Sequence, residues 1–218
     1  MRKALAGIVF ILAGLAQAGV ARAEQVVIAA LGDSLTQGYG LPAAQGFVPQ
    51  LQAWLDAQGA DVRLINAGVS GDTTAGGLSR VAWTLTPEVD GMIVALGGND
   101  LLRGLAPEQA RSNIDGILQA ADTAKVEVLL IGMAAPGNFG PAYKSQFDAI
   151  YPELAAHYGS GYLESFFAGL SAVGDISNPL TLKDYFQADG VHPNAEGVAL
   201  IVTQVGPKVL ALIDEITG

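Results

Sequence analysis

Short apolar runs alternate along this chain with longer segments of helical periodicity. Four of the runs are rich in β-branched residues, as is typical of strands that are buried on both faces of a parallel sheet. The predicted strands are Val26–Leu31, Val62–Ala67, Met92–Leu96 and Val126–Met133, with Gly161–Phe167 as a candidate fifth. This alternation predicts an α/β fold, a three-layer α/β/α sandwich with a mostly parallel sheet.

The segments between the runs carry apolar residues at helical spacing. The first has them at i, i+4, i+7 and i+8, from Phe47 to Leu55, and Gly59 is its expected stop. The other predicted helices lie around Leu78–Leu85, at Pro107–Ala124, at Tyr143–His157 despite Pro152, and at Asn194–Thr217 with a kink or break at Gly206-Pro207. No internal repeat or linker divides the chain, so we expect one domain.

The first 23 residues have the order of a secretory signal peptide. Two basic residues precede an apolar run over residues 4–16, and Ala21-Arg22-Ala23 supplies small residues two apart. The run is shorter than the ~20 residues of a membrane-spanning helix, so a retained anchor is the less favoured alternative. We expect cleavage after Ala23, or as a second choice after Ala18. The domain 24–218 would then be periplasmic or secreted, without stable membrane insertion.

The charged residues are mostly acidic. The chain has 21 Asp and Glu against 11 Lys and Arg, for a formal net charge of -10. A phosphate backbone would be repelled, so we expect no nucleic-acid partner. The chain has no cysteine, and its two histidines cannot build an all-histidine metal site. We therefore expect no metal site, and we expect no organic cofactor either.

Glycine-rich polar blocks follow three of the predicted strands. Ser34, in the sequence LGDSLT, follows the first strand and should lie at the carboxyl edge of the sheet, where such folds bind ligands. Gly71, after the second strand, can offer an unobstructed backbone N–H, and Asn99, after the third, can donate a side-chain N–H. Each block alone is equally well explained by a turn or a helix cap, with the capping candidates Asp33, Asp72 and Thr73.

A fourth block, Asp189-Gly190-Val191-His192, precedes the last predicted helix. A three-residue spacing across a tight turn can bring the carboxylate onto the imidazole Nδ1, which leaves Nε2 free as a base. The other histidine, His157, has no such partner and ends a predicted helix, where a partly exposed cation is favourable. His192 is therefore the candidate base.

Two familiar motifs do not apply to this chain, one because of its context and one because of its sequence. The segment Gly38–Ala43 satisfies G-x-G-x-x-A, but it begins seven residues after the strand and contains Pro42, so we do not expect nucleotide binding. The nucleophile-elbow pattern G-x-S-x-G fails because Thr36 stands in place of its second glycine. The usual α/β-hydrolase fold is therefore not the obvious one.

Taken together, the blocks GDSLT, SGDT, GGND and DGVHPN resemble those of the SGNH (GDSL-type) hydrolases in order and approximate spacing. The similarity points to the thioesterase I/lysophospholipase/arylesterase branch. It implies a flavodoxin-like sandwich with Ser34 as nucleophile, His192 as base and Asp189 as the acid that orients it. It also implies an oxyanion hole made of the Ser34 and Gly71 backbone N–H groups and the Asn99 side chain.

The resemblance implies a serine esterase that forms an acyl-enzyme. Its expected substrates are small-molecule esters or lipids, namely aryl and acyl esters, with lysophospholipids and acyl-thioesters as further candidates. A carbohydrate O-acetylesterase is an alternative, and a non-catalytic periplasmic binding module is an alternative of another class. The sequence leaves the oligomeric state open, and a monomer is plausible.

Chain-length preference should come from apolar loops, because the triad acts only on the carbonyl. We expect Leu78 and Leu101 to border the oxyanion hole, since they follow the blocks of Gly71 and Asn99. The segment Pro136–Tyr151, with Phe139 and Tyr143, should add a further apolar wall. Short to medium acyl esters are the expected good substrates.

Overall fold

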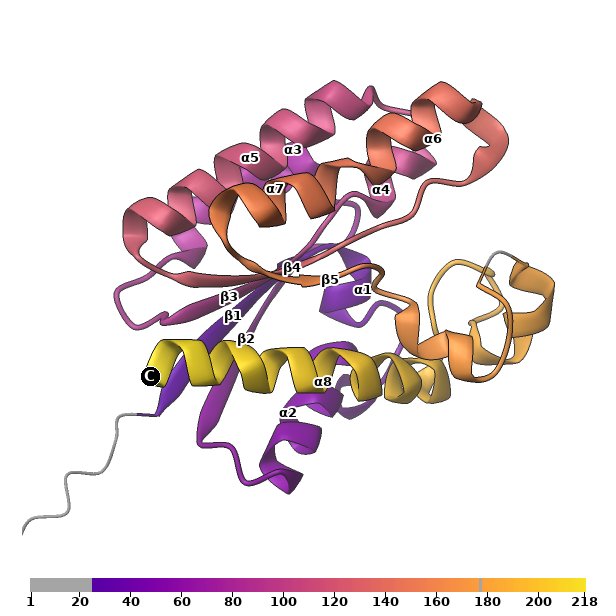
Figure 1. Ribbon diagram of the computed structural model, residues 1–218. Helices are drawn as coiled ribbons and strands as arrows, with labels where there is room; N and C mark the ends of the chain where they lie inside the picture. The colour runs from indigo at the N-terminus through magenta and orange to yellow at the C-terminus, as the bar shows by residue number, and fades with distance from the viewer. Residues whose placement is uncertain (1–24, 177) are drawn as a thin grey trace, which may run out of the picture.

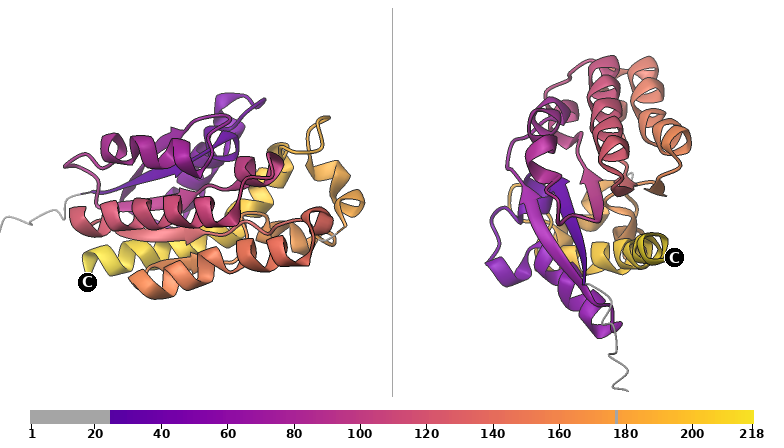
Figure 2. Two further views of the ribbon diagram at one scale, coloured as in Figure 1. Left: turned by 90° about the horizontal axis from the view of Figure 1, so that it is seen from above. Right: turned by 90° about the vertical axis from the view of Figure 1, so that its left-hand side faces the viewer.

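The computed structural model describes residues 25–176 and 178–218, and the predicted signal peptide lies outside this part of the chain. Figure 1 shows a sheet between two layers of helices, and the side view in Figure 2 shows the same separation. One face is covered by α2 (Phe47–Ala57) and α8 (Ala195–Thr217); the other is covered by α3 (Thr74–Thr84), α5 (Pro107–Ala124), α6 (Pro141–Asp148) and α7 (Ile150–Tyr158). The predicted three-layer α/β architecture is confirmed.

The sheet is parallel throughout and has the strand order β2-β1-β3-β4-β5. Its strands are β1 (Val26–Gly32), β2 (Val62–Gly68), β3 (Gly91–Ala95), β4 (Glu127–Ile131) and β5 (Gly161–Leu163). This is the flavodoxin-like order, in which the chain reverses its direction across the sheet between β1 and β3. The loops that follow these two strands therefore flank the position where such folds bind ligands.

The strands differ in burial according to their place in the sheet. Every residue of β1 and β3 is buried, as predicted, but β2 is an edge strand in which only Val62 is buried. The prediction that β2 is buried on both faces is therefore wrong. The Gln52 amide of α2 donates to the Val62 carbonyl (2.9 Å) and accepts from the Leu64 N–H (2.8 Å). This side chain satisfies backbone groups of an edge that could otherwise pair with another chain.

The fifth strand is shorter than predicted. It ends at Leu163 because its neighbour β4 ends at Ile131 and leaves no further partner. The Gly132 N–H donates to the Leu163 carbonyl, and the Phe166 N–H donates to the Gly132 carbonyl, so the chain turns there. Phe166 is thereby buried against Phe47, with ring centroids 5.1 Å apart.

The helix predicted over residues 143–157 is two helices. One ends at Asp148 and the next begins at Ile150. Pro152 has no N–H to donate and would clash with a carbonyl one turn earlier in a continuous helix. In α7 it lies in the first turn, where backbone N–H groups have no helical partner in any case.

The last helix runs without a break through Gly206-Pro207, so the predicted break is wrong. Pro207 and Thr203, one turn earlier, are both exposed, so this stretch of the helix lies on the solvent side of the molecule. Gly206 lies against the Trp54 ring of α2, where a methyl group would overlap the indole. The small residue lets α8 approach α2 closely.

By length and hydropathy, α8 is the one helix of the described residues that could cross a membrane. It packs against the sheet, and 44% of its most apolar window is buried inside the molecule. Its buried aliphatic side chains form one stripe along the helix, namely Val198, Ile201, Val202, Val205, Val209 and Leu212.

Candidate active site

Ser34 lies at the beginning of the short helix α1 (Ser34–Gln37), directly beyond the carboxyl end of β1. The Asp33 side chain caps this helix, because its Oδ1 accepts from the Leu35 N–H at 3.0 Å. The predicted cap is therefore confirmed. It holds Ser34 in a fixed turn with its side chain at the edge of the sheet.

The loop before α8 brings an acid and a base to this serine. The His192 Nε2 lies 2.8 Å from the Ser34 Oγ, and its Nδ1 lies 2.7 Å from the Asp189 Oδ2. The Asp189 Oδ1 accepts from the backbone N–H groups of His192 (3.0 Å) and Val191 (2.9 Å). These two bonds, and the bond to the imidazole, lower the pKa of Asp189 to about 2. The three candidate triad residues therefore form one continuous chain of contacts, which ends in an ionised carboxylate.

Gly71 and Asn99 face the same cavity from neighbouring loops. Gly71 lies between β2 and α3 with φ of 84°, and Asn99 lies in the short helix α4 (Gly98–Leu102). Among the described residues, no hydrogen bond uses the backbone N–H of Ser34 or of Gly71. Both N–H groups are therefore free to bind an oxygen atom in the cavity.

The Asn99 amide is oriented by Asp33. Its Nδ2 donates to the Asp33 Oδ2 at 3.3 Å, which leaves its second N–H for another acceptor. Burial raises the pKa of Asp33 to about 6, although the hydrogen bonds from Leu35 and Asn99 oppose this rise. Asp33 was predicted only as a helix cap. Its contact with Asn99 depends on how two strands pair, and no local sequence signal reports that.

The Gly71 and Asn99 loops are tied together by a buried carboxylate. Asp100 accepts from the Thr74 backbone N–H (2.8 Å) and from the Thr74 hydroxyl (2.7 Å). The Asn113 side chain of α5 donates to the same hydroxyl at 2.9 Å. The two loops are thus held at a fixed separation. Thr73, one of the predicted caps, is the N-cap of α3.

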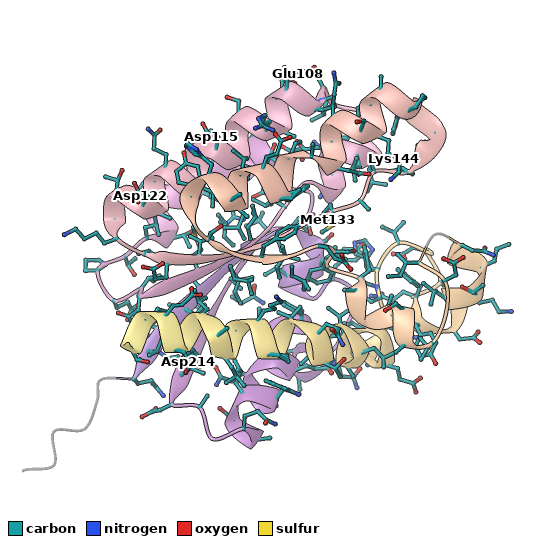
Figure 3. All side chains as sticks on the ribbon, in the orientation of Figure 1. Glu108, Asp115, Asp122, Met133, Lys144 and Asp214 are labelled. Carbon is teal, nitrogen blue, oxygen red and sulfur yellow. The ribbon has the colours of Figure 1, made fainter. Side chains whose placement is uncertain are left out.

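The site opens into a cavity of about 1070 Å³. Most of its wall is apolar and includes Leu35, Leu101, Met133, Pro136, Phe139 and Phe167. Figure 3 labels two residues of this wall, Met133 just beyond the end of β4 and Lys144 on α6. The Lys144 Nζ donates to the Ala135 carbonyl and pairs with Asp148, both at 2.7 Å, so it is engaged at the edge of the wall.

Two of the four predicted wall residues line the cavity and two do not. Leu101 and Phe139 line it. Leu78 points instead to α5, where it packs over Gly116, so the prediction that it borders the oxyanion hole is wrong. Tyr143 lies behind Phe139, with ring centroids 4.9 Å apart, and its hydroxyl donates to the Leu105 carbonyl. It supports the wall without forming it.

Tyr39 is a cavity residue that the sequence did not identify. Its ring lies 4.7 Å from the His192 ring, and the Gln187 amide donates to its carbonyl at 2.8 Å. It belongs to the segment that superficially matches a dinucleotide motif. His157, in contrast, lies in the last turn of α7 as predicted. In the described part of the chain, no three His, Asp or Glu side chains are grouped as metal ligands would be.

The chain is similar to known proteins over most of its length. Residues 30–200 match the model of the GDSL-like lipase/acylhydrolase family. Esterase TesA of Pseudomonas aeruginosa is 36% identical over 184 residues, which are 84% of this chain and 87% of that protein. The thioesterase 1/protease 1/lysophospholipase L1 of Escherichia coli K12 is 32% identical over 84% of this chain and 83% of its own.

A solved structure shares the fold as well. The SGNH-hydrolase family esterase AlinE4 is 44% identical, with a TM-score of 0.69 over 87% of this chain and 97% of its own. The chain belongs to the GDSL-like lipase/acylhydrolase family.

Proposed function

We propose that this protein is a serine esterase in which Ser34 is the nucleophile, His192 the general base and Asp189 the residue that orients the base. The observation that carries the proposal is the continuous chain of contacts from Asp189 through His192 to Ser34, which ends in an apolar cavity. Its relatives include proteins named esterase, thioesterase and lysophospholipase.

The first step follows from the protonation states of these groups. A serine hydroxyl is a weak nucleophile, so His192 accepts its proton as the oxygen attacks the ester carbonyl. The Asp189 carboxylate stabilises the imidazolium that forms and holds the ring with Nε2 toward Ser34. The imidazolium then protonates the departing alcohol, and an acyl-enzyme remains. Water activated by the same histidine releases the acid and restores Ser34.

The tetrahedral intermediate carries negative charge on the former carbonyl oxygen. In this proposal it is stabilised by the N–H groups of Ser34 and Gly71 and by the Asn99 amide, which Asp33 orients. Loss of one such donor costs ~3–4 kcal/mol of activation free energy, or ~100–1,000-fold in rate. The proposed intermediate therefore depends on the placement of three donors from three loops.

The cavity favours an apolar acyl group. Its wall is mostly carbon and suits substrates that carry an apolar acyl or aryl group. The proposed substrate classes are therefore aryl esters, acyl-thioesters and lysophospholipids. The formal charge of -10 should discourage anionic lipids. We further propose that the chain is exported and cleaved after Ala23, and that residues 24–218 act as one domain.

Hydrolysis of p-nitrophenyl butyrate by purified protein tests the proposal. Ser34→Ala should fold like the wild type and lose activity on the order of a million-fold. Ser79→Ala, which removes an exposed hydroxyl on α3, is the matched control and should keep full activity. If folded Ser34→Ala keeps a tenth of the wild-type rate, the nucleophile is wrongly assigned.

The same panel should include an acetylated polysaccharide. Hydrolysis of that substrate alone would favour a carbohydrate O-acetylesterase. A folded wild type without activity on esters, thioesters, lysophospholipids or acetylated sugars would favour a binding module.

A further inference from the structure

Arg80 of α3 lies next to the candidate site but contributes no atom to the cavity wall. Its side chain is mostly buried, with 21% exposed. We infer that Arg80 is a positioning residue that sets the distance between the Ser34 and Gly71 loops, and thereby the geometry of the oxyanion hole. The inference rests on the proposed function.

The guanidinium makes three short contacts in three directions. Its Nε lies 2.6 Å from the Asp72 Oδ2, its Nη1 donates to the Ala67 carbonyl at 2.6 Å, and its Nη2 donates to the Gly32 carbonyl at 2.8 Å. The two carbonyls belong to the carboxyl ends of the neighbouring strands β2 and β1. Arg80 thus joins both strand ends to the loop that follows β2.

These partners are adjacent to the groups that would hold the oxyanion. Gly32 lies two residues before Ser34, and Asp72 lies one residue after Gly71. The Gly32 carbonyl also accepts from the Val69 N–H at 3.0 Å, so it is a junction between the two loops. A shift of the guanidinium would move the Ser34 and Gly71 N–H groups relative to each other.

The chemistry requires arginine at this position. Side chains in a helix lean toward its N-terminus, so Arg80 reaches back past the start of α3 at Thr74. Its planar fork presents five N–H donors in fixed directions, whereas the lysine ammonium is a compact charge on a flexible stem. Lysine could keep the ion pair with Asp72 but could not also hold both carbonyls in this arrangement.

Arg80→Lys tests the inference, and Arg63→Lys is the matched control. Arg63 forms a 2.7 Å ion pair with Glu88 near the opposite end of β2, with 44% of its side chain exposed. We expect Arg80→Lys to lower kcat for p-nitrophenyl butyrate about 100-fold, as a displacement of ~1 Å can. KM should stay within about twofold, because the acyl wall is untouched. Arg63→Lys should leave both constants unchanged.

A thionoester substrate separates the oxyanion hole from a general loss of structure. Sulfur is a weaker hydrogen-bond acceptor than oxygen, so the wild type should hydrolyse the ester much faster than its thiono analogue. Arg80→Lys should reduce the ratio of the ester rate to the thionoester rate at least fivefold. The displaced N–H groups of its oxyanion hole would stabilise an oxygen anion less well. If the substitution instead perturbed only the nucleophile or the fold, hydrolysis of the ester and of the thionoester would slow by the same factor.

The outcomes separate this inference from the proposed function. If wild type hydrolyses esters and Ser34→Ala does not, an unchanged kcat or an unchanged ester preference in folded Arg80→Lys overturns the role of Arg80 alone. If Arg80→Lys does not fold, Asp72→Ala is tested in its place. This change removes the ion pair that holds the Gly71 loop to Arg80, and it keeps the Arg80 hydrogen bonds to the Ala67 and Gly32 carbonyls. Asp72→Ala should also lower the ratio of the ester rate to the thionoester rate. An unchanged ratio would overturn the inference.

Discussion

Asp33 makes two hydrogen bonds in a buried position, and burial disfavours its ionised form. One carboxylate oxygen caps α1 and the other holds the Asn99 amide, while the residue is only 2% exposed. Because burial disfavours the ionised form, its pKa rises from 3.8 to about 6. The folded state therefore binds this proton more tightly than the unfolded chain. The resulting stabilisation is complete below pH 3.8 and is lost as the pH rises through about 6.

The raised pKa of Asp33 predicts that the wild type and Asp33→Asn differ in free energy of unfolding by an amount that depends on pH, because the asparagine amide does not titrate. The wild-type free energy of unfolding, minus that of the variant, should fall by about 1 kcal/mol between pH 5 and pH 8. Urea unfolding at both pH values measures the gap. If the two proteins follow parallel pH curves, Asp33 does not titrate in this range.

At this scale the sequence predicts local pairs and misses distant ones. Asp189 and His192 could be paired from their spacing, because three residues in a tight turn fix the contact. Ser34 is 158 residues from His192, and only the family resemblance indicated that they meet. Tyr39 and Arg80 carried no signal. The partners of Tyr39 lie in the segment before α8, far along the chain, and Arg80 joins the ends of two strands whose pairing the local pattern does not specify.

Among the elements, the connection between β4 and α6 forms one side of the cavity. It is tied to α6 at Ala135, whose N–H donates to Asp148 at 2.7 Å and whose carbonyl accepts from Lys144. Beyond this tie, the Phe139 ring lies at the cavity wall with 42% of the residue exposed. An aromatic ring placed there can contact an acyl chain beyond its first carbons.

Phe139→Ala should therefore change chain-length preference more than it changes the chemical step. In a p-nitrophenyl ester series from acetate to octanoate, kcat/KM should fall more for the longer esters, since each buried methylene is worth up to ~0.8 kcal/mol. Trp83→Ala removes a highly exposed aromatic ring of α3 and should leave the series unchanged. A common reduction factor for all chain lengths would show that Phe139 is not part of the acyl wall.

Strands and helices were predictable where burial or capping is local. The runs of β1 and β3 are apolar throughout because both of their faces are covered. The end of β5 depends on where β4 ends, and the direction of Leu78 depends on how α3 packs on α5. Such features are set by the neighbouring element, so periodicity alone could not predict them.

At the level of the whole molecule, strand order explains why residues from both ends of the chain form one site. β1 and β3 are central neighbours, so the Ser34 and Asn99 loops meet where the chain reverses direction across the sheet. The loop before α8 then brings His192 to the same edge. Residues 30–200, which match the family model, span all of these loops.

The predicted signal peptide can be tested on the full-length chain. Protein expressed with its full sequence in a Gram-negative host should appear in the periplasm with Glu24 as its first residue, because the small residues before it suit signal peptidase. Intact-mass and N-terminal mass spectrometry of the periplasmic fraction measure this. A full-length chain retained in the membrane fraction would contradict the proposed export.

Every step of the proposed mechanism depends on Ser34 as the nucleophile. Incubation with an activated organophosphorus ester, diethyl p-nitrophenyl phosphate, followed by peptide mapping identifies the residue that attacks. If Ser34 is the nucleophile, one phosphoryl adduct per chain forms on the peptide that contains Ser34, and ester hydrolysis is lost in parallel with labelling. An adduct on another residue, or complete labelling of Ser34 with activity intact, would show that Ser34 is not the nucleophile.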